Sequence, residues 1–120
     1  MNPILIRRIA PAWLPLLVIG SLQPSRPGSV HAMHREIHFL AFGGTAFLLL
    51  LVTRSRREEM GVVVGGCLLG LSLEYLQHLF YRNVIEWWDV RDDTIAVLAA
   101  LVLYRLFAAG RAAFRAPSRQ

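Results

Sequence analysis

Residues 61–81, GVVVGGCLLGLSLEYLQHLFY, form the longest apolar run of the chain. At a rise of about 1.5 Å per residue, a helix over this run is roughly 31 Å long, enough to cross the hydrocarbon core of a bilayer. Three polar side chains, Glu74, Gln77 and His78, nevertheless lie in its second half. Because polar groups are costly in hydrocarbon, the run predicts both a membrane-spanning helix and polar partners that hold these three groups.

Further apolar runs lie on both sides of this one, and together they determine the expected fold. The 120 residues are 55% hydrophobic and include no long polar region. This composition predicts one all-α domain, residues 1–120, that forms an integral membrane four-helix bundle. An alternative for the first run is a signal peptide cleaved after residue 32. The expected spans are about 4–22, 35–53, 61–81 and 89–110.

The basic residues predict the orientation of the bundle. All 13 are arginines, and nine of them lie at the N-terminus, in the connection 54–60 and from Arg105 onward. The positive-inside rule then predicts that both termini are cytoplasmic, in a bacterial cytoplasmic (inner) membrane. The arginines lie between the apolar runs and do not form one basic patch. The net charge of +5 therefore favours anionic lipid head groups as partners and not nucleic acid. The absence of lysine and the single Cys67 exclude Schiff-base chemistry, an internal disulfide and a cysteine metal cluster.

This orientation places the polar ends of three runs at the extracytoplasmic face. In each run, polar and small residues recur every three or four positions, which predicts that they lie on one face of a helix. The polar residues lie at the outer end of this stripe, and the small residues lie deeper in the membrane. Two GxxxG spacings, Gly61 to Gly65 and Gly66 to Gly70, predict close approach of a neighbouring helix. The predicted stripes are His34, His38, Ala41 and Thr45; Gly66, Gly70, Glu74, Gln77, His78 and Tyr81; and Asp89, Asp93, Ala96 and Ala100.

The order and spacing of these polar residues resemble the VanZ-like family of bacterial membrane proteins. The matching positions are Arg35, His38, Phe42, Glu74, Gln77 and Asp89. The chain departs from the family pattern at His34, Asn83, Asp93 and Ala96, which replace an aspartate, an arginine, an asparagine and a glycine. The resemblance implies a four-span envelope protein, and the founding member of the family is associated with resistance to the glycopeptide teicoplanin.

The preferred functional hypothesis is an extracytoplasmic binding site for a cell-envelope component such as a lipid-linked precursor. Arginine offers forked donors to phosphate, and carboxylates accept from sugar or peptide donors. Membrane lipids are the other expected partners, and a homo-oligomer remains open. The predicted binding residues are Arg35, His38, Glu74, Gln77, Arg82, Asp89 and Asp93.

Two other classes of function stay open from the sequence. In one, the polar residues are structural, pairing Glu74 with Arg82 or Arg35 and Asp89 with Arg91 to set helix register in a structural or anchoring subunit. In the other, the chain is a metal-dependent membrane enzyme, because histidines and a glutamate four residues apart share a helix face. The metal candidates are His34, His38, Glu74 and His78. A haem held by His38 and His78 is a further alternative, although no cofactor is expected and no enzyme signature is present.

Overall fold

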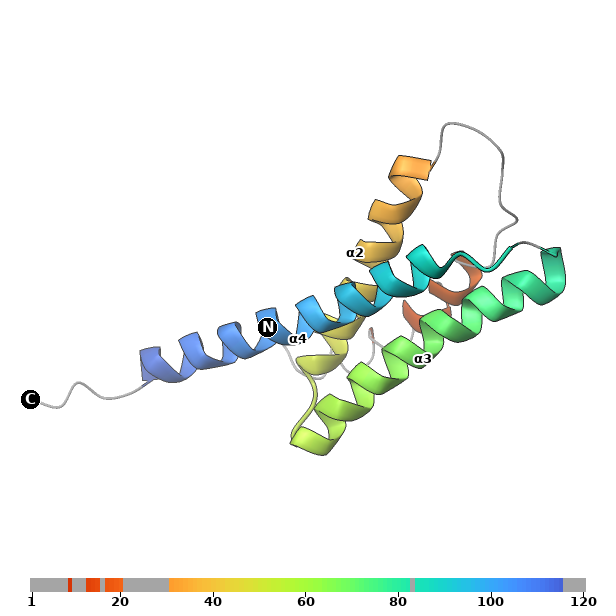
Figure 1. The fold of residues 1–120 in the computed structure, drawn as a ribbon. Coiled ribbons are helices and arrows are strands. Elements are labelled where there is room, and N and C mark those ends of the chain that lie inside the picture. Colours follow the sequence, from red (N-terminus) through yellow and green to blue (C-terminus); the bar gives the residue numbers. More distant parts are fainter. Residues whose placement is uncertain (1–8, 10–12, 16, 21–30, 83, 116–120) are drawn as a thin grey trace, which may run out of the picture.

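The structure, a computed structural model, describes residues 9, 13–15, 17–20, 31–82 and 84–115 (Figure 1). In this part of the chain every regular element is a helix: α2 spans His31–Leu50, α3 spans Arg56–Tyr81 and α4 spans Trp87–Arg115. Helical residues at 13–15 and 17–20 precede them and fit the predicted count of four helices. Most of the expected first span, 4–22, lies outside the described residues.

Local capping explains where the helices begin and end. Ser55 is the N-cap of α3, its hydroxyl accepting from the amide of Glu58 at 3.3 Å, so the helix begins five residues before the apolar run. At the other end Arg82 adopts a left-handed conformation, with φ 54°, and closes the helix. Helix α2 ends at Leu50, three residues before the expected end of its span, and the hydroxyl of Thr53 donates to the carbonyl of Leu50.

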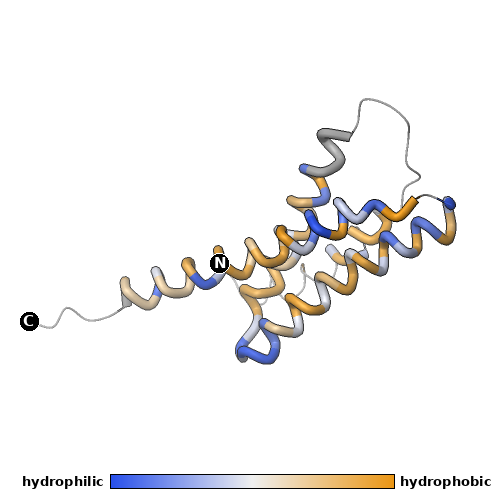
Figure 2. Tube along the Cα trace, in the orientation of Figure 1, coloured by the Kyte–Doolittle hydropathy of each residue, from blue (hydrophilic) through white to orange (hydrophobic). Residues whose placement is uncertain are grey.

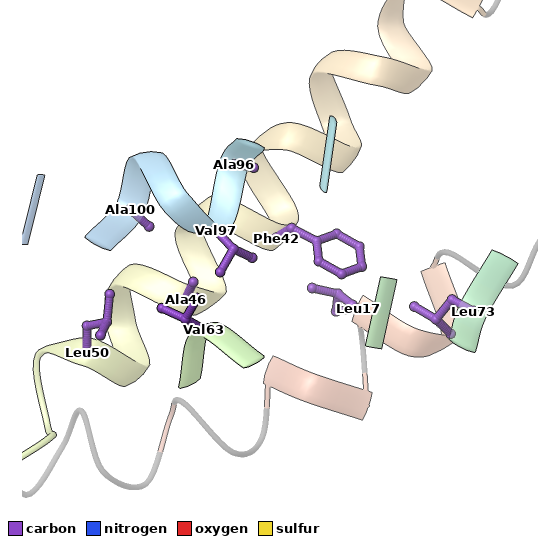
Figure 3. Packing of buried hydrophobic residues seen from close by; sticks show 9 residues of the cluster. All are labelled: Leu17, Phe42, Ala46, Leu50, Val63, Leu73, Ala96, Val97 and Ala100. Carbon is purple, nitrogen blue, oxygen red and sulfur yellow. The ribbon is translucent and has the colours of Figure 1, made fainter. Parts of the chain in front are cut away.

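Helix α4 packs against both α2 and α3, and small residues allow the close approach. At Gly43 an added Cβ would lie 3.3 Å from the carbonyl oxygen of Ala96, and at Gly66 it would lie 2.9 Å from a methyl carbon of Val97. Between them the helices bury an apolar core (Figure 3). This core consists of Leu17, Phe42, Ala46, Leu50, Val63, Leu73, Ala96, Val97 and Ala100.

The two GxxxG spacings behave differently, and this corrects one sequence prediction. Gly66 and Gly70 pack against α4, as expected. Gly61 and Gly65 do not receive a neighbouring helix, because a Cβ added at either one would meet no atom within 4 Å. Small residues permit close packing but do not impose it.

Among the described residues, two helices are long and apolar enough to cross a membrane, Arg56–Tyr81 and Trp87–Phe114, and Glu36–Leu50 is a shorter apolar helix. Large apolar side chains on their outer faces are exposed, among them Leu68, Leu79 and Val102. In Figure 2 the hydrophilic residues gather at the turn between α2 and α3 and where α3 passes to α4, with apolar stretches between them. This distribution suits helices whose outer faces contact lipid.

Candidate functional site

Five of the seven predicted binding residues are buried where α2 meets the end of α3 and the start of α4. Asp93, the most deeply buried of them, is 3% exposed, and His38, the least, is 9% exposed. The stripe predicted for α4 is confirmed, because all four of its residues are buried. Charged and polar side chains are rarely buried without a reason, so this cluster is the candidate site. We call it the polar cluster: His38 from α2, Glu74 and Gln77 from α3, and Asp89, Asp92 and Asp93 from α4.

An ion pair between α2 and α4 lies at the centre of the polar cluster. Nδ1 of His38 is 3.4 Å from Oδ1 of Asp93, with both side chains buried. The ring of Phe42, one turn along α2, stacks on the imidazole with 6.1 Å between ring centroids. Gly70 of α3 makes room for the pair, since an added Cβ would lie 3.1 Å from Oδ2 of Asp93. All three helices therefore define the position of the Asp93 carboxyl group.

Glu74 has a partner that sequence reasoning did not predict. Its Oε1 accepts a hydrogen bond from the backbone amide of Glu86 at 2.5 Å. One alternative left open by the sequence paired Glu74 with Arg82 or Arg35; in the structure Arg82 caps α3 and its side chain is exposed. The side chain of Arg35 lies outside the described residues. Glu74 thus fastens the segment before α4 to the end of α3.

Arg91 is also held differently from the prediction. Its Nε and Nη2 donate to Oδ1 of Asp92, at 2.9 and 2.6 Å, and not to Asp89. Its guanidinium also lies over the ring of Trp88, 4.5 Å from the centroid. Trp87 and Trp88 are both exposed. Because Nε and Nη2 both donate to one oxygen of Asp92, the guanidinium of Arg91 has fewer donors left for a phosphate.

The stripe predicted for α3 is narrower in the structure. Gly70, Glu74 and Gln77 are buried, but His78 and Tyr81 are exposed, so including these two was wrong. In the part of the chain that the structure describes, no group of three or more His, Cys, Asp or Glu side chains could hold a metal ion. Of the metal candidates, His78 is exposed whereas His38 and Glu74 are buried, and the side chain of His34 lies outside the described part.

An apolar cavity lies on the side of Phe42 away from His38, and its volume is about 620 Å³. Helices α2 and α3 form most of its wall, together with Val97 of α4 and with Leu14, Leu17 and Val18 from the N-terminal helical residues. Thr45 lines it as well, 5% exposed, and its hydroxyl has no hydrogen-bond partner among the described residues. The volume falls within the range of roughly 300–1,000 Å³ that is common for ligand sites.

Sequence reasoning missed three contributions to this region. Asp92 is 7% exposed and joins the polar cluster, which its distance of three residues from Asp89 would have indicated. Phe42 was matched to the family pattern, but its contact with His38 and its place in the cavity wall depend on helix packing. The backbone amide of Glu86 has no signature in a sequence at all.

No protein-family model, curated protein or solved structure matches the chain. The chemistry of the site therefore has to be argued from its own residues. Four carboxyl groups, an amide and an imidazole meet at one end of the helices, beside exposed tryptophans. Such a set is rich in hydrogen-bond acceptors and suits a ligand that brings hydroxyl, amide or ammonium donors.

Proposed function

We propose that the chain is a VanZ-like, multi-pass protein of the bacterial cytoplasmic membrane, with both termini in the cytoplasm. Its polar cluster binds the polar head of a cell-envelope component such as a lipid-linked precursor, on the extracytoplasmic side. Resistance to glycopeptides such as teicoplanin is the phenotype that this function would affect. The chain binds its ligand without a resident cofactor.

One observation carries the proposal. Five of the seven binding residues that the sequence predicted, His38, Glu74, Gln77, Asp89 and Asp93, are buried in one region of the structure. In the part of the chain that the structure describes, two helices are long and apolar enough to cross a membrane, and four of these five residues lie in them. Ionisable side chains within such helices usually line a ligand or ion path, because burying them only for stability is costly.

The acceptor-rich chemistry refines what the ligand offers. Glu74 and Asp93 present carboxyl oxygens beside Gln77, whereas Arg91 is already engaged with Asp92. Sugar hydroxyls, peptide amides and amino groups therefore match the cluster better than a bare phosphate does. Trp87 and Trp88 are exposed and offer flat faces on which a sugar ring or a lipid can pack.

Native mass spectrometry of untagged protein released gently from its membrane tests the proposal. We expect a discrete bound mass that is lost in Asp93→Asn and in Glu74→Gln. The matched control is Glu86→Gln, whose exposed side chain is not the group that binds Glu74.

Two results together would contradict the proposal: a spectrum with no bound mass, and unchanged glycopeptide sensitivity in cells from which the gene is deleted. The polar cluster would then have a structural role. Loss of the bound mass in Glu86→Gln as strongly as in Glu74→Gln would show that the assay reports general damage at this end of the protein.

A further inference from the structure

The apolar cavity has features of a second binding region, separate from the polar cluster. Phe42 divides the two: its ring stacks on His38 on one side and lines the cavity on the other. The cavity extends along α2 from Phe42 to Leu49, continues to Thr53 after the helix, and runs along α3 from Leu69 back to Glu58. It therefore leads away from the polar cluster towards the turn between α2 and α3.

The charge at that turn indicates what lies at the open end. Arg54, Arg56 and Arg57 are exposed there, next to the cavity residues Thr53 and Glu58. Of the two glutamates nearby, Glu58 accepts a hydrogen bond from the amide of Arg54, and Glu59 is paired with Arg105. The turn thus carries a surplus of positive charge, which attracts anionic lipid head groups.

The inner surface of the cavity indicates the chemistry of the occupant. Among the described residues that line it, only Thr45, Thr53 and Glu58 carry polar side chains, and the last two lie at the end beside the turn. Gly61 and Gly65 widen it, because neither glycine has a neighbouring atom within 4 Å of where a Cβ would be. In a bilayer an open apolar cavity of this volume is filled by hydrocarbon, since water finds too few polar partners there.

We propose that this cavity binds one acyl chain of an anionic phospholipid, whose head group lies against Arg54, Arg56 and Arg57. The inference rests on the membrane location in the proposed function, but not on ligand binding by the polar cluster. The lipid would hold the N-terminal helical residues Leu14, Leu17 and Val18 against α2 and α3, because all three line the same space.

Photolabelling in vesicles tests the inference. The protein is reconstituted with a trace of phosphatidylglycerol that carries a diazirine in one acyl chain, and the labelled residues are located by peptide mass spectrometry. We expect saturable labelling of residues 42–53 and 58–69, competed by unlabelled phosphatidylglycerol and only weakly by phosphatidylcholine. A protein that carbonate extracts from the vesicles would contradict both this inference and the proposed function.

Glycine variants separate cavity binding from general lipid contact. Gly65→Leu fills the cavity from open space and should abolish the saturable labelling. Gly44→Leu is the matched control, because Gly44 is also without neighbours within 4 Å but does not line the cavity. Labelling that persists in Gly65→Leu, or that spreads evenly over exposed residues such as Leu79 and Val102, would overturn the proposal while leaving the proposed function intact.

Two further variants identify the occupant. Replacing Arg56 and Arg57 by Gln should remove the preference for the anionic lipid, so that unlabelled phosphatidylcholine competes with the probe as well as phosphatidylglycerol does. Thr45→Val should leave labelling unchanged or increase it, because an acyl chain gives the hydroxyl no acceptor; Thr94→Val, whose hydroxyl bonds the carbonyl of Val90, is its control. A several-fold loss in Thr45→Val alone would overturn the acyl chain in favour of a ligand with a polar group at that depth.

Discussion

Glycines have opposite roles in the two halves of α3. In the half that leads to the polar cluster, Gly66 and Gly70 bring α4 so close that Val97 and Asp93 occupy the space of a side chain. In the half that leads to the turn with α2, Gly61 and Gly65 border an apolar cavity of about 620 Å³. Close packing thus accompanies the buried polar groups, and open space accompanies the apolar surface.

This difference has a physical reason. Buried carboxyl groups are tolerated only when partners hold them in place, so the helices must be near one another around Asp93 and Glu74. Apolar walls make no such demand in a membrane, where lipid chains can replace protein contacts at little cost. The predictions that follow test each half separately.

The largest expected effect comes from the ion pair between α2 and α4. Asp93→Ala removes the carboxyl partner of buried His38, and we expect the free energy of unfolding to fall by about 3 kcal/mol. A double-mutant cycle with His38→Ala, measured by steric trapping in bicelles, should give a coupling of about 1–3 kcal/mol. Additive losses in the cycle would mean that the two side chains do not interact.

The next effect contrasts the two GxxxG spacings directly. Gly70→Ala places a methyl group 3.1 Å from Oδ2 of Asp93, so the carboxyl group or the helix must move. Such overpacking costs about 1–3 kcal/mol of unfolding free energy. Gly61→Ala, with open space around it, should change stability little. Equal losses in the same unfolding assay would remove the distinction between the halves.

A smaller effect is expected from the hydrogen bond that fastens the start of α4. Glu74→Gln replaces a carboxylate acceptor for the amide of Glu86 by a neutral one, at a cost of about 1 kcal/mol. Hydrogen exchange should show faster exchange at the Glu86 amide, while the amide of Asp89, which donates to the carbonyl of Glu86, changes less. If the Glu86 amide exchanges equally slowly in Glu74→Gln and in the unchanged protein, the hydrogen bond to Glu74 does not protect it.

The smallest effect concerns the other half of α3. Glu59 pairs with Arg105 of α4 near the turn, where the arginine side chain is 44% exposed. We expect Arg105→Gln to lower the free energy of unfolding by about 0.5 kcal/mol, and less at high salt. A loss as large as that of Asp93→Ala would mean that the polar cluster is not the main polar contact between helices.

Much of the site was predictable because helical periodicity is a local property. Steps of three and four residues placed Glu74 and Gln77 on the buried side of α3, and Asp89 and Asp93 on the buried side of α4. The same rule was wrong for His78 and Tyr81, which are exposed. The buried face of α3 is narrower than the six-residue stripe that the spacing predicted. Spacing predicts a direction around the helix but not the width of the contact.

The sequence by itself determined the helices and which of their faces are polar. Apolar runs and the spacing of the acidic residues are local features, so no neighbour was needed to interpret them. Only the tertiary structure decided which partner each polar group takes: Asp93 for His38, the Glu86 amide for Glu74 and Asp92 for Arg91. Distances between helices depend on how all the side chains pack at once. This packing places α4 against Gly66 and Gly70 and leaves open space beside Gly61 and Gly65.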